Sequence, residues 1–517
     1  MSCRVVLDWG GRRWDITGEM VEIVDEMSIA SDATTIPERS VTVDLPLGDV
    51  VTHARTHHPR TAYAQVYHGS RLVASELVES ITPGRQGELS RVVVGQRTDP
   101  LASTIPATYD VAVRSVNQAA TARQNLREDQ RIRDRIDWLY YANPLSAINE
   151  TITTDYQTIY AVNVAGQAYP RVYGKPGRDG TPGSKALPVD SANNILMVAG
   201  HLCTPGTVTL HGPKAGSLDK TVTETATVYN GTDGAGRAVA FIDVSSLSTV
   251  ADNWSTALGA DQKDWYVQWD GTAAGLSSDP VDVVSDLLRH MVGAPIDWES
   301  VESVRGPLTG YTIDGTIDTE TSAEAVLMQQ ILPLLPVRMV RTVSGVGLVL
   351  VRWEATARDA RCALVAGDQC WPTSRVRYAS EEGGRVVNQW VVRWAMSRLS
   401  DGPARQTTVN GGRHALAAAS VSIHGPRAET LETAWVYTAS TAGRVAIDRI
   451  NETAKDRQVV DLAVSAATYG AGGVRELRLG DVVTYTDPAE SLSGAVALVS
   501  SVSRSGSEVD GVGLVLL

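Results

Sequence analysis

One segment in the second half of the 517-residue chain indicates the fold of its surroundings. It is Val337-Arg-Met-Val-Arg-Thr-Val-Ser-Gly-Val-Gly-Leu-Val-Leu-Val-Arg-Trp353. Two stretches rich in valine and leucine flank the Ser344-Gly345 pair, and a glycine-containing turn between such stretches is the pattern of a β-hairpin. This predicts two antiparallel strands joined at residues 344–345. The hairpin supplies the β part of a compact unit whose helices are predicted on its N-terminal side.

Two helical patterns precede the hairpin. The first follows Ser278-Asp279-Pro280, where a capping residue and an N1 proline mark a helix start, and it stops at Gly293. The second begins at Thr321, where Glu324 completes a capping box. Its buried face is predicted to comprise Leu327, Met328, Ile331 and Leu335. Two helices packed on a hairpin predict an α+β unit over residues 277–355.

The first 104 residues carry strand patterns. Residues 39–45 alternate polar and apolar side chains, and residues 63–67 and 71–76 flank a His-Gly-Ser turn. A further strand is expected at residues 89–94, after two glycine-containing breakers. These patterns predict a first small barrel or sandwich over residues 1–104.

Residues 105–276 differ in composition from the rest of the chain. Five of the six lysines lie between residues 175 and 263. Acids and bases alternate at helical spacing over about residues 113–141, which favours a solvated charged helix over a nucleic-acid surface. Short strand patterns then recur at the spacing of a β-sandwich. We predict an inserted β-rich module with an N-terminal charged helix, and its two ends should lie close together because it leaves and re-enters one host fold.

The C-terminal part predicts a return to the first barrel and then a second barrel. Residues 385–394 form a strand pattern that we expect to rejoin the first barrel, so that residues 356–430 belong to that region. A helix from about Ser440 and four strand patterns predict a helix plus a closing barrel over residues 431–517. The fold class is therefore multidomain and mainly β with α+β parts: β-barrels, an inserted β-rich module and a helix-hairpin unit.

One strand of the closing barrel allows a prediction about side-chain direction. Leu479 and Val483 are an even number of residues apart, so they should point to the same face, after a Gly480-Asp481 turn. If that face is inward, a charge at Val483 would be buried without a partner.

Composition narrows the class of protein. The chain is 43% hydrophobic and 20% charged, as soluble globular proteins are, and its net charge of −13 disfavours a surface that tracks phosphates. No window approaches 18 uncharged apolar residues, and the N-terminus lacks the apolar core of a signal peptide, so we expect no membrane span and synthesis in a cytoplasm. The cysteines form no C-x-x-C pair and are expected to be reduced, although a hairpin could join the last two. They are Cys3, Cys203, Cys362 and Cys370.

Motifs of catalytic and cofactor sites are missing from the sequence. It contains no H-E-x-x-H, no P-loop and no G-x-S-x-G, and its glycine-rich segments lack the third glycine of a dinucleotide loop. Among the acids of residues 314–320, Asp314, Asp318 and Glu320 cannot be reduced to a glycosidase pair, because an acidic protein offers too many carboxylates. We assign no catalytic, cofactor-binding or metal-binding residues, and we expect no cofactor and no enzymatic activity.

The histidines form two groups, and neither favours a metal. One group lies in a segment with no acid or thiol nearby, which favours a solvated loop. The second group has a spacing that metal ligands could have, but its residues are divided between a predicted turn and a predicted strand. A metal site is therefore the weaker interpretation. His290, at a helix end, suits a capping role. The first group is His53, His57 and His58, and the second is His201, Cys203 and His211.

Two patterns in the inserted module leave alternatives open. Residues 174–183 contain three Gly-x-y triplets, which three chains could wind together, although an exposed loop is the simpler interpretation. Trp265 and Trp269, with Tyr266 between them, could stack on sugar, while a buried core explains them at least as well.

Four short segments carry a resemblance to a known family. They are Thr312-Ile-Asp-Gly-Thr-Ile317 before the second helix, the Ser344-Gly345 hairpin turn, Val387-Asn-Gln-Trp-Val-Val392, and Leu477-Arg-Leu-Gly-Asp-Val-Val483 before the strand that follows Gly494. A barrel with a lectin-like insertion, a helix-hairpin unit, a returning strand and a terminal helix plus barrel come in the same order. In this order the chain resembles the tail hub proteins of tailed bacteriophages and gene transfer agents, over essentially its whole length.

The resemblance implies structural work in a virion. It implies a homotrimer at the tail tip or baseplate that joins the sixfold tail tube to threefold tip or fibre components, with roles in host attachment and genome ejection. The implied partners are distal tail or tail tube proteins, the tape measure protein and fibre or tip proteins. It also implies assembly in the bacterial host cytoplasm and no specific nucleic-acid binding, with DNA free to pass through a lumen. The chain stops after the closing barrel, whereas many relatives continue into fibre or peptidase regions, so we expect those activities to reside on other chains or to be absent.

An alternative from another class stays open at this point. A carbohydrate-binding or glycan-degrading virion or surface protein would also carry a β-rich insertion with exposed aromatic side chains. Oligomeric mass and glycan binding distinguish the two classes.

Overall fold

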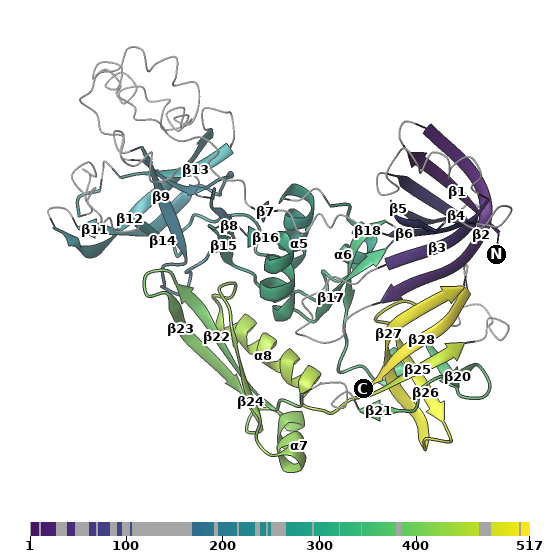
Figure 1. Ribbon diagram of the computed structural model, residues 1–517. Coiled ribbons are helices and arrows are strands. Elements are labelled where there is room, and N and C mark those ends of the chain that lie inside the picture. Colours follow the sequence, from purple (N-terminus) through teal and green to yellow (C-terminus); the bar gives the residue numbers. More distant parts are fainter. Residues whose placement is uncertain are drawn as a thin grey trace.

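The computed structural model describes most of the chain outside residues 106–167. The described residues are 2–9, 12–26, 39–46, 62–68, 71–82, 90–95, 104–105, 168–190, 195–214, 217–232, 238–244, 247–249, 265–291, 294–319, 321–342, 344–378, 385–464, 477–505 and 508–517. The fold is multidomain and mainly β, as expected (Figure 1). The charged helix predicted near residues 113–141 lies outside the described residues.

The N-terminal strands form a ring of pairings, shown in purple in Figure 1. The order is β1-β4-β5-β6-β3-β2, and β2 pairs back to β1. Val41, Val43 and Leu45 are fully buried and alternate with more exposed residues, as their period-2 pattern predicts. The strands are β1 (Ser2–Trp9), β2 (Arg12–Glu26), β3 (Arg39–Leu45), β4 (Tyr63–His68), β5 (Arg71–Thr82) and β6 (Ser90–Gly95).

Where the sequence predicts the closing barrel, the C-terminal strands pair in the order β19-β26-β27-β28-β25-β20 within the same large sheet. Gly480, at φ +79°, makes the turn before β26, and Val483 points into the core with no exposed surface. Leu479 lies before the strand and is half-buried against the same core. The strands are β19 (Cys362–Val365), β20 (Cys370–Pro372), β21 (Arg377–Tyr378), β25 (Gln458–Val464), β26 (Val482–Asp487), β27 (Leu492–Ser505) and β28 (Glu508–Leu516).

The two outer barrels share one sheet. β2 is long enough to close the first barrel with its first half and to pair with β27 through residues 23–26. β27 in turn pairs with β26 and β28 inside the closing barrel. The first and last parts of the chain are therefore joined by backbone hydrogen bonds.

The central unit contains the predicted hairpin. β17 (Val337–Thr342) and β18 (Gly345–Leu350) form the predicted antiparallel hairpin. Gly345, which was predicted in the turn, is instead the first residue of β18 and pairs with Thr342, so the register differs from the predicted one. The first helix, α5 (Pro280–Asp286), continues as a π-helical turn, η7 (Leu287–Met291). Asp279 caps it by accepting from two backbone N–H groups, with Pro280 at N1 as expected. A short helix, α6 (Trp298–Ser303), packs on β18.

The predicted capping box at Thr321 and Glu324 is wrong. Thr321 and Ser322 form strand β16 (Thr321–Ser322), which pairs with β7 (Thr104–Ile105), so Thr321 is held in a ladder. The Ser322 hydroxyl accepts from the Ala325 N–H at 3.0 Å, and Glu324 makes no side-chain cap bond. The helix that follows is the π-helical η8 (Ala325–Ile331), continued by η9 (Leu332–Leu334). Its four predicted core residues are buried.

The strand expected to rejoin the first barrel lies elsewhere. β22 (Gln389–Ser397) pairs with β23 (Gly402–Val409) and β24 (Ala428–Glu432) in a separate three-stranded sheet. Helix α8 (Ala439–Thr453) packs on β22 and β23, beside α7 (Ala415–His424). Side chains of this sheet and α8 share a core with the helices of the central unit, and β19 to β21 belong to the closing barrel. Residues 356–430 therefore do not return to the first barrel, because their apolar faces are covered by these other layers.

The inserted module contains a closed barrel with its own core, in the order β10-β13-β12-β11-β14-β9. Just before it, β8 (Arg171–Tyr173) pairs with β15 (Gly315–Ile317), and the fully buried Tyr173 belongs to the core of the central unit. The chain leaves and returns side by side, since the Gly275 N–H donates to the Gly174 carbonyl at 2.8 Å. The strands are β9 (Ser184–Asp190), β10 (Ile195–Ala199), β11 (Gly206–Lys214), β12 (Ser217–Thr232), β13 (Ala238–Asp243) and β14 (Trp265–Gln268).

Removal of this barrel is expected to leave the rest of the chain folded. We predict that replacing residues 184–268 with a short Gly-Ser linker, together with Trp269→Ser, gives soluble protein with an unchanged melting transition for the remaining units. The barrel has a separate core, and loop closure costs little. The retained ends also lie close together, since the residue 269 N–H donates to the Pro176 carbonyl at 3.2 Å. Calorimetry tests this. The control Tyr173→Ala should instead lower the transition by creating a cavity in the central core. Insoluble deletion protein would contradict the prediction.

Candidate functional site at the junction of the inserted barrel and the central unit

The loop of residues 174–183 joins β8 to the inserted barrel and carries the Gly-x-y triplets. Gly174, Gly177 and Gly180 have φ values of +59°, +95° and +100°. A collagen strand needs φ near −75°, so the triplets cannot wind into a triple helix in this conformation. The exposed-loop interpretation is also wrong, because both prolines and Gly177 and Gly183 are buried. The glycines serve a compact loop packed between two units.

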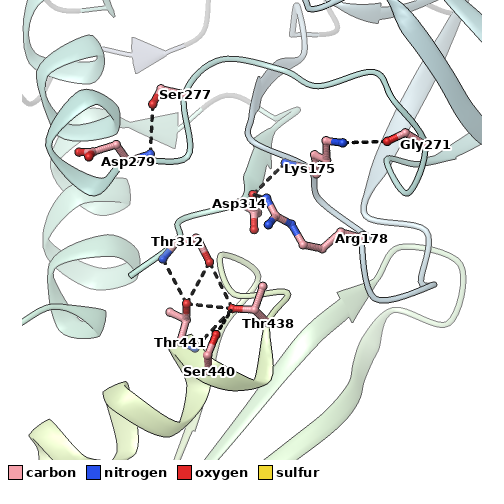
Figure 2. A network of polar contacts seen from close by, with 10 residues as sticks. All are labelled: Lys175, Arg178, Gly271, Ser277, Asp279, Thr312, Asp314, Thr438, Ser440 and Thr441. Atoms are coloured by element: carbon pink, nitrogen blue, oxygen red, sulfur yellow. Dashed lines mark hydrogen bonds and ion pairs between the residues drawn. The ribbon is translucent and has the colours of Figure 1, made fainter. Parts of the chain in front are cut away.

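Asp314 is the centre of the contacts made by this loop (Figure 2). Its side chain has no exposed surface, and its Oδ1 accepts from the Lys175 N–H at 2.8 Å and from Arg178 Nη2 at 2.7 Å. The Lys175 ammonium donates to the Gly271 carbonyl at 2.8 Å, at the chain's return. A Cβ at Gly174 would lie 2.0 Å from Asp314 Oδ1, so only glycine fits there. Burial raises the pKa of Asp314, and Arg178 offsets part of that effect.

Two further ion pairs tie the sheet of β22 and β23 to the same region. Arg398 contacts Asp318 at 3.0 Å, and the Arg398 N–H donates to the Pro182 carbonyl at 2.8 Å. Arg405 on β23 lies 3.5 Å from Asp179 in the loop. Burial also raises the pKa of Asp318. The carboxylates therefore hold three segments together, and each is neutralised by an arginine from another segment.

The N-terminus of α8 is bound to the segment that carries Asp314. Thr438 caps α8 by accepting from the Thr441 N–H, and both hydroxyls lie within 3.2 Å of the Thr312 hydroxyl (Figure 2). The Asp314 N–H donates to the Trp435 carbonyl at 3.0 Å, just before this cap. The segment 312–317, singled out from the sequence, thus connects α8, the central unit and the loop.

The histidine–cysteine group makes structural contacts. His201 Nε2 accepts from the Val172 N–H at 2.9 Å, and Nδ1 faces the Leu202 carbonyl at 2.8 Å. Burial lowers the pKa of His201 to about 4, so the ring is neutral. His211 contacts Gln268 at 3.1 Å. In the described part of the chain no three His, Cys, Asp or Glu side chains are grouped to hold a metal ion.

The remaining candidate residues lie in the protein core, at the surface, or outside the described residues. Trp265 and Trp269 fill the inserted barrel, and Trp269 Nε1 donates to the Ser184 hydroxyl at 2.8 Å, so neither can stack on sugar. His290 is exposed at the end of η7. All four cysteines are free thiols. His53, His57, His58 and Glu320 lie outside the described residues.

Asp448, a half-buried acid on α8, was not singled out by the sequence. Asp448 accepts from the Tyr311 hydroxyl, and burial raises its pKa from 3.8 to about 6. The charges of Glu354 and Glu452 also raise the pKa of Asp448, while the charge of Arg449 lowers it. The signal was hidden because Asp448 and Tyr311 are 137 residues apart and nothing in the pattern of α8 distinguishes this acid from exposed ones.

Asp448 is expected to make stability depend on pH. Between about pH 4 and 6 the folded protein holds a proton that the unfolded chain releases, so the free energy of unfolding should fall as pH rises through that window. The loss is on the order of 2 kcal/mol. Urea unfolding of Asp448→Asn across this range should give a flatter profile than wild type. A profile as steep as wild type would contradict this assignment.

Comparison with solved structures finds chains that are similar at low sequence identity and at TM-scores below 0.5. No family model and no curated protein matches the chain. The 43 kDa tail protein of prophage MuSo2 from Shewanella oneidensis is similar over 99% of this chain and 98% of its own, at 11% identity and a TM-score of 0.40. The tail protein from Neisseria meningitidis MC58 is similar over 100% of this chain and 96% of its own, at 8% identity and a TM-score of 0.38. A chain from the virion of a native gene transfer agent particle is similar over 68% of this chain and 85% of its own, at 12% identity and a TM-score of 0.38.

No helix among the described residues is both long and apolar enough to cross a membrane.

Proposed function

We propose that this chain is a structural protein of a phage or gene transfer agent tail, working as a homotrimeric hub at the tail tip or baseplate. In that role it joins the sixfold tail tube to threefold tip or fibre components and takes part in host attachment and genome ejection. Its partners are distal tail or tail tube proteins, the tape measure protein and fibre or tip proteins. Assembly takes place in the bacterial host cytoplasm.

The arrangement of the two outer barrels carries the proposal. Strand β2 extends from the first barrel into a pairing with β27, so one continuous sheet unites both barrels (Figure 1). The inserted barrel and the central unit lie between them in the chain, in the order on which the resemblance to tail hubs rests, although the expected returning strand joins a separate sheet. In a threefold ring, such units repeat the same interface around one axis and close without growing into a filament.

The ion pairs of the junction support a structural role. Asp314 and Asp318 are paired with Arg178 and Arg398 from other segments. Buried pairs of this kind fix the relative position of packed segments, because breaking one leaves an uncompensated charge. A rigid connection suits a connector that must transmit force between tail components.

Oligomeric state and location in the virion test the proposal together. Size-exclusion chromatography with light scattering should give about three times the 55.2 kDa chain mass. Tagged protein should also appear in purified tails, at their tip in electron micrographs. A stable monomer at micromolar concentration that is absent from tails would refute the hub.

We also propose that the chain has no hydrolytic activity of its own. The sequence lacks nucleophile, zinc and phosphate-loop motifs, and the two buried acids of the junction are engaged by arginines. Zymography on host peptidoglycan and polysaccharide should therefore show no clearing. Clearing that disappears when one Asp or Glu is replaced would favour the glycan-degrading alternative instead.

A further inference from the structure

A cleft of about 310 Å³ lies between α5, η7 and α6 on the central unit. Its volume is at the lower end of small-molecule sites. It is separate from the interior of the inserted barrel, where Trp265 and Trp269 lie. The side chains that matter for its chemistry are an exposed tryptophan, a buried hydroxyl and a group of carboxylates.

Trp298 forms one wall of the cleft. It is the first residue of α6 and is 44% exposed, although Val301 in the same helix is completely buried. The Arg289 guanidinium lies 5.8 Å from the centre of the Trp298 ring. An exposed indole lining a cleft offers a large flat apolar surface that the protein's own core does not use.

Ser285 supplies an unused hydrogen-bonding group in the same cleft. The residue is 9% exposed, and its hydroxyl has no hydrogen-bond partner in the structure. Buried hydroxyls are normally paired, because desolvation costs free energy that only a hydrogen bond offsets. A ligand with its own hydroxyl groups would pair this one.

One guanidinium holds two carboxylates of the cleft, Asp282 and Glu302, together with the nearby Asp279. Arg305 contacts Asp279 at 3.0 Å, Asp282 at 2.8 Å and Glu302 at 2.8 Å. Each carboxylate has about four lone-pair sites, so a single arginine leaves several acceptors open. The wall is therefore rich in fixed acceptors.

The charges select the class of ligand. An anion is disfavoured because it would meet the lining carboxylates of Asp282, Asp286 and Glu302. A cation is disfavoured because Arg289 already lies over the Trp298 ring and His290 also lines the cleft. What fits is a neutral molecule with one apolar face and several hydroxyls.

We propose that this cleft binds a neutral pyranose unit of a glycan. The C–H face of the sugar ring packs on Trp298, its hydroxyls donate to Asp282 and Glu302, and one hydroxyl pairs with Ser285. The site does not rest on the hub proposal, since it uses only residues of the central unit.

Ligand-observed saturation-transfer NMR on the full-length protein tests the site. The probes are glucose, galactose, N-acetylglucosamine and rhamnose, each titrated as the free sugar. At least one should bind. Trp298→Ala should weaken that binding by at least about tenfold. The control Trp371→Ala, which removes a 46% exposed tryptophan from the closing barrel, should leave it unchanged.

Ser285→Ala separates binding from folding. It should weaken sugar binding about threefold while leaving the melting temperature equal or higher, because it removes a buried hydroxyl without a partner. A merely structural serine would lower stability and leave binding unchanged. The proposal is overturned by wild-type protein that binds none of the four sugars, by binding that survives Trp298→Ala, or by equal losses in Trp371→Ala. Binding of methylguanidinium in place of sugars would assign the cleft to a cation and also overturn it.

Discussion

Val483→Asp is expected to unfold the closing barrel. Val483 has no exposed surface and pairs with Cys362 on one side and Ala497 on the other, within a core that also holds Leu364 and Tyr485. A carboxylate at this position would be buried without a counter-charge, at a cost of several kcal/mol. Folded domains are stable by only about 5–15 kcal/mol, so most of that margin would be lost. Circular dichroism and urea unfolding measure the effect.

Thr484→Asp is the matched control. Thr484 is the next residue of β26 and is half-buried on the opposite face, where a carboxylate can reach water. It should change the unfolding midpoint far less than Val483→Asp does. If both variants melt like wild type, the face assigned to this strand is wrong.

Asp314→Ala should loosen the junction. The change leaves the Lys175 N–H and the Arg178 guanidinium without their acceptor, in a place where Asp314 itself is completely buried. Removing one partner of a buried pair costs about 3–5 kcal/mol. Because Arg178 is 30% exposed and can turn toward water, we expect about 3 kcal/mol, the lower end of that range. Urea unfolding and proteolysis of the loop at residues 174–183 measure the loss.

Two variants bracket this result. Asp314→Asn keeps an oxygen acceptor for the Lys175 N–H and should lose less stability than alanine. Glu432→Ala breaks the exposed pair between Arg393 and Glu432, which is 2.8 Å long, and should cost less than about 1 kcal/mol. An Asp314→Ala protein as stable as Glu432→Ala would mean that the junction does not depend on this carboxylate.

The elements predicted best were those whose signals are local. The existence of the hairpin at residues 337–350 was predicted, because its turn and both strands lie within a few residues of one another, although its register differs from the predicted one. The start of α5 was also predicted, since Asp279 and Pro280 are adjacent to the helix that they begin. Strand alternation predicted that Leu479 and Val483 share a face, and both contact the core of the closing barrel.

The incorrect predictions concern partners that are distant in sequence. The strand pattern of β22 does not indicate which sheet the strand joins. Both of its edges pair with β23 and β24, so neither edge is open to the first barrel. Thr321 matched the pattern of a capping box, but in the structure it is a strand residue that pairs with Ile105. Asp314 could not be distinguished from other acids, because its partner Arg178 is 136 residues away. The glycines of residues 174–183 matched a collagen repeat, while their positive φ values depend on packing.

The pairing of β2 with β27 has a consequence for synthesis on the ribosome. The described core residues of the first barrel lie between positions 3 and 94, so that core can form early in translation. Residues 23–26 must wait for residues 501–504, which leave the exit tunnel long after this core. Until then the nascent chain displays an unpaired strand edge, which invites pairing with other chains. Stalled or truncated translation products should therefore aggregate through β2, and cells with depleted chaperones should accumulate them.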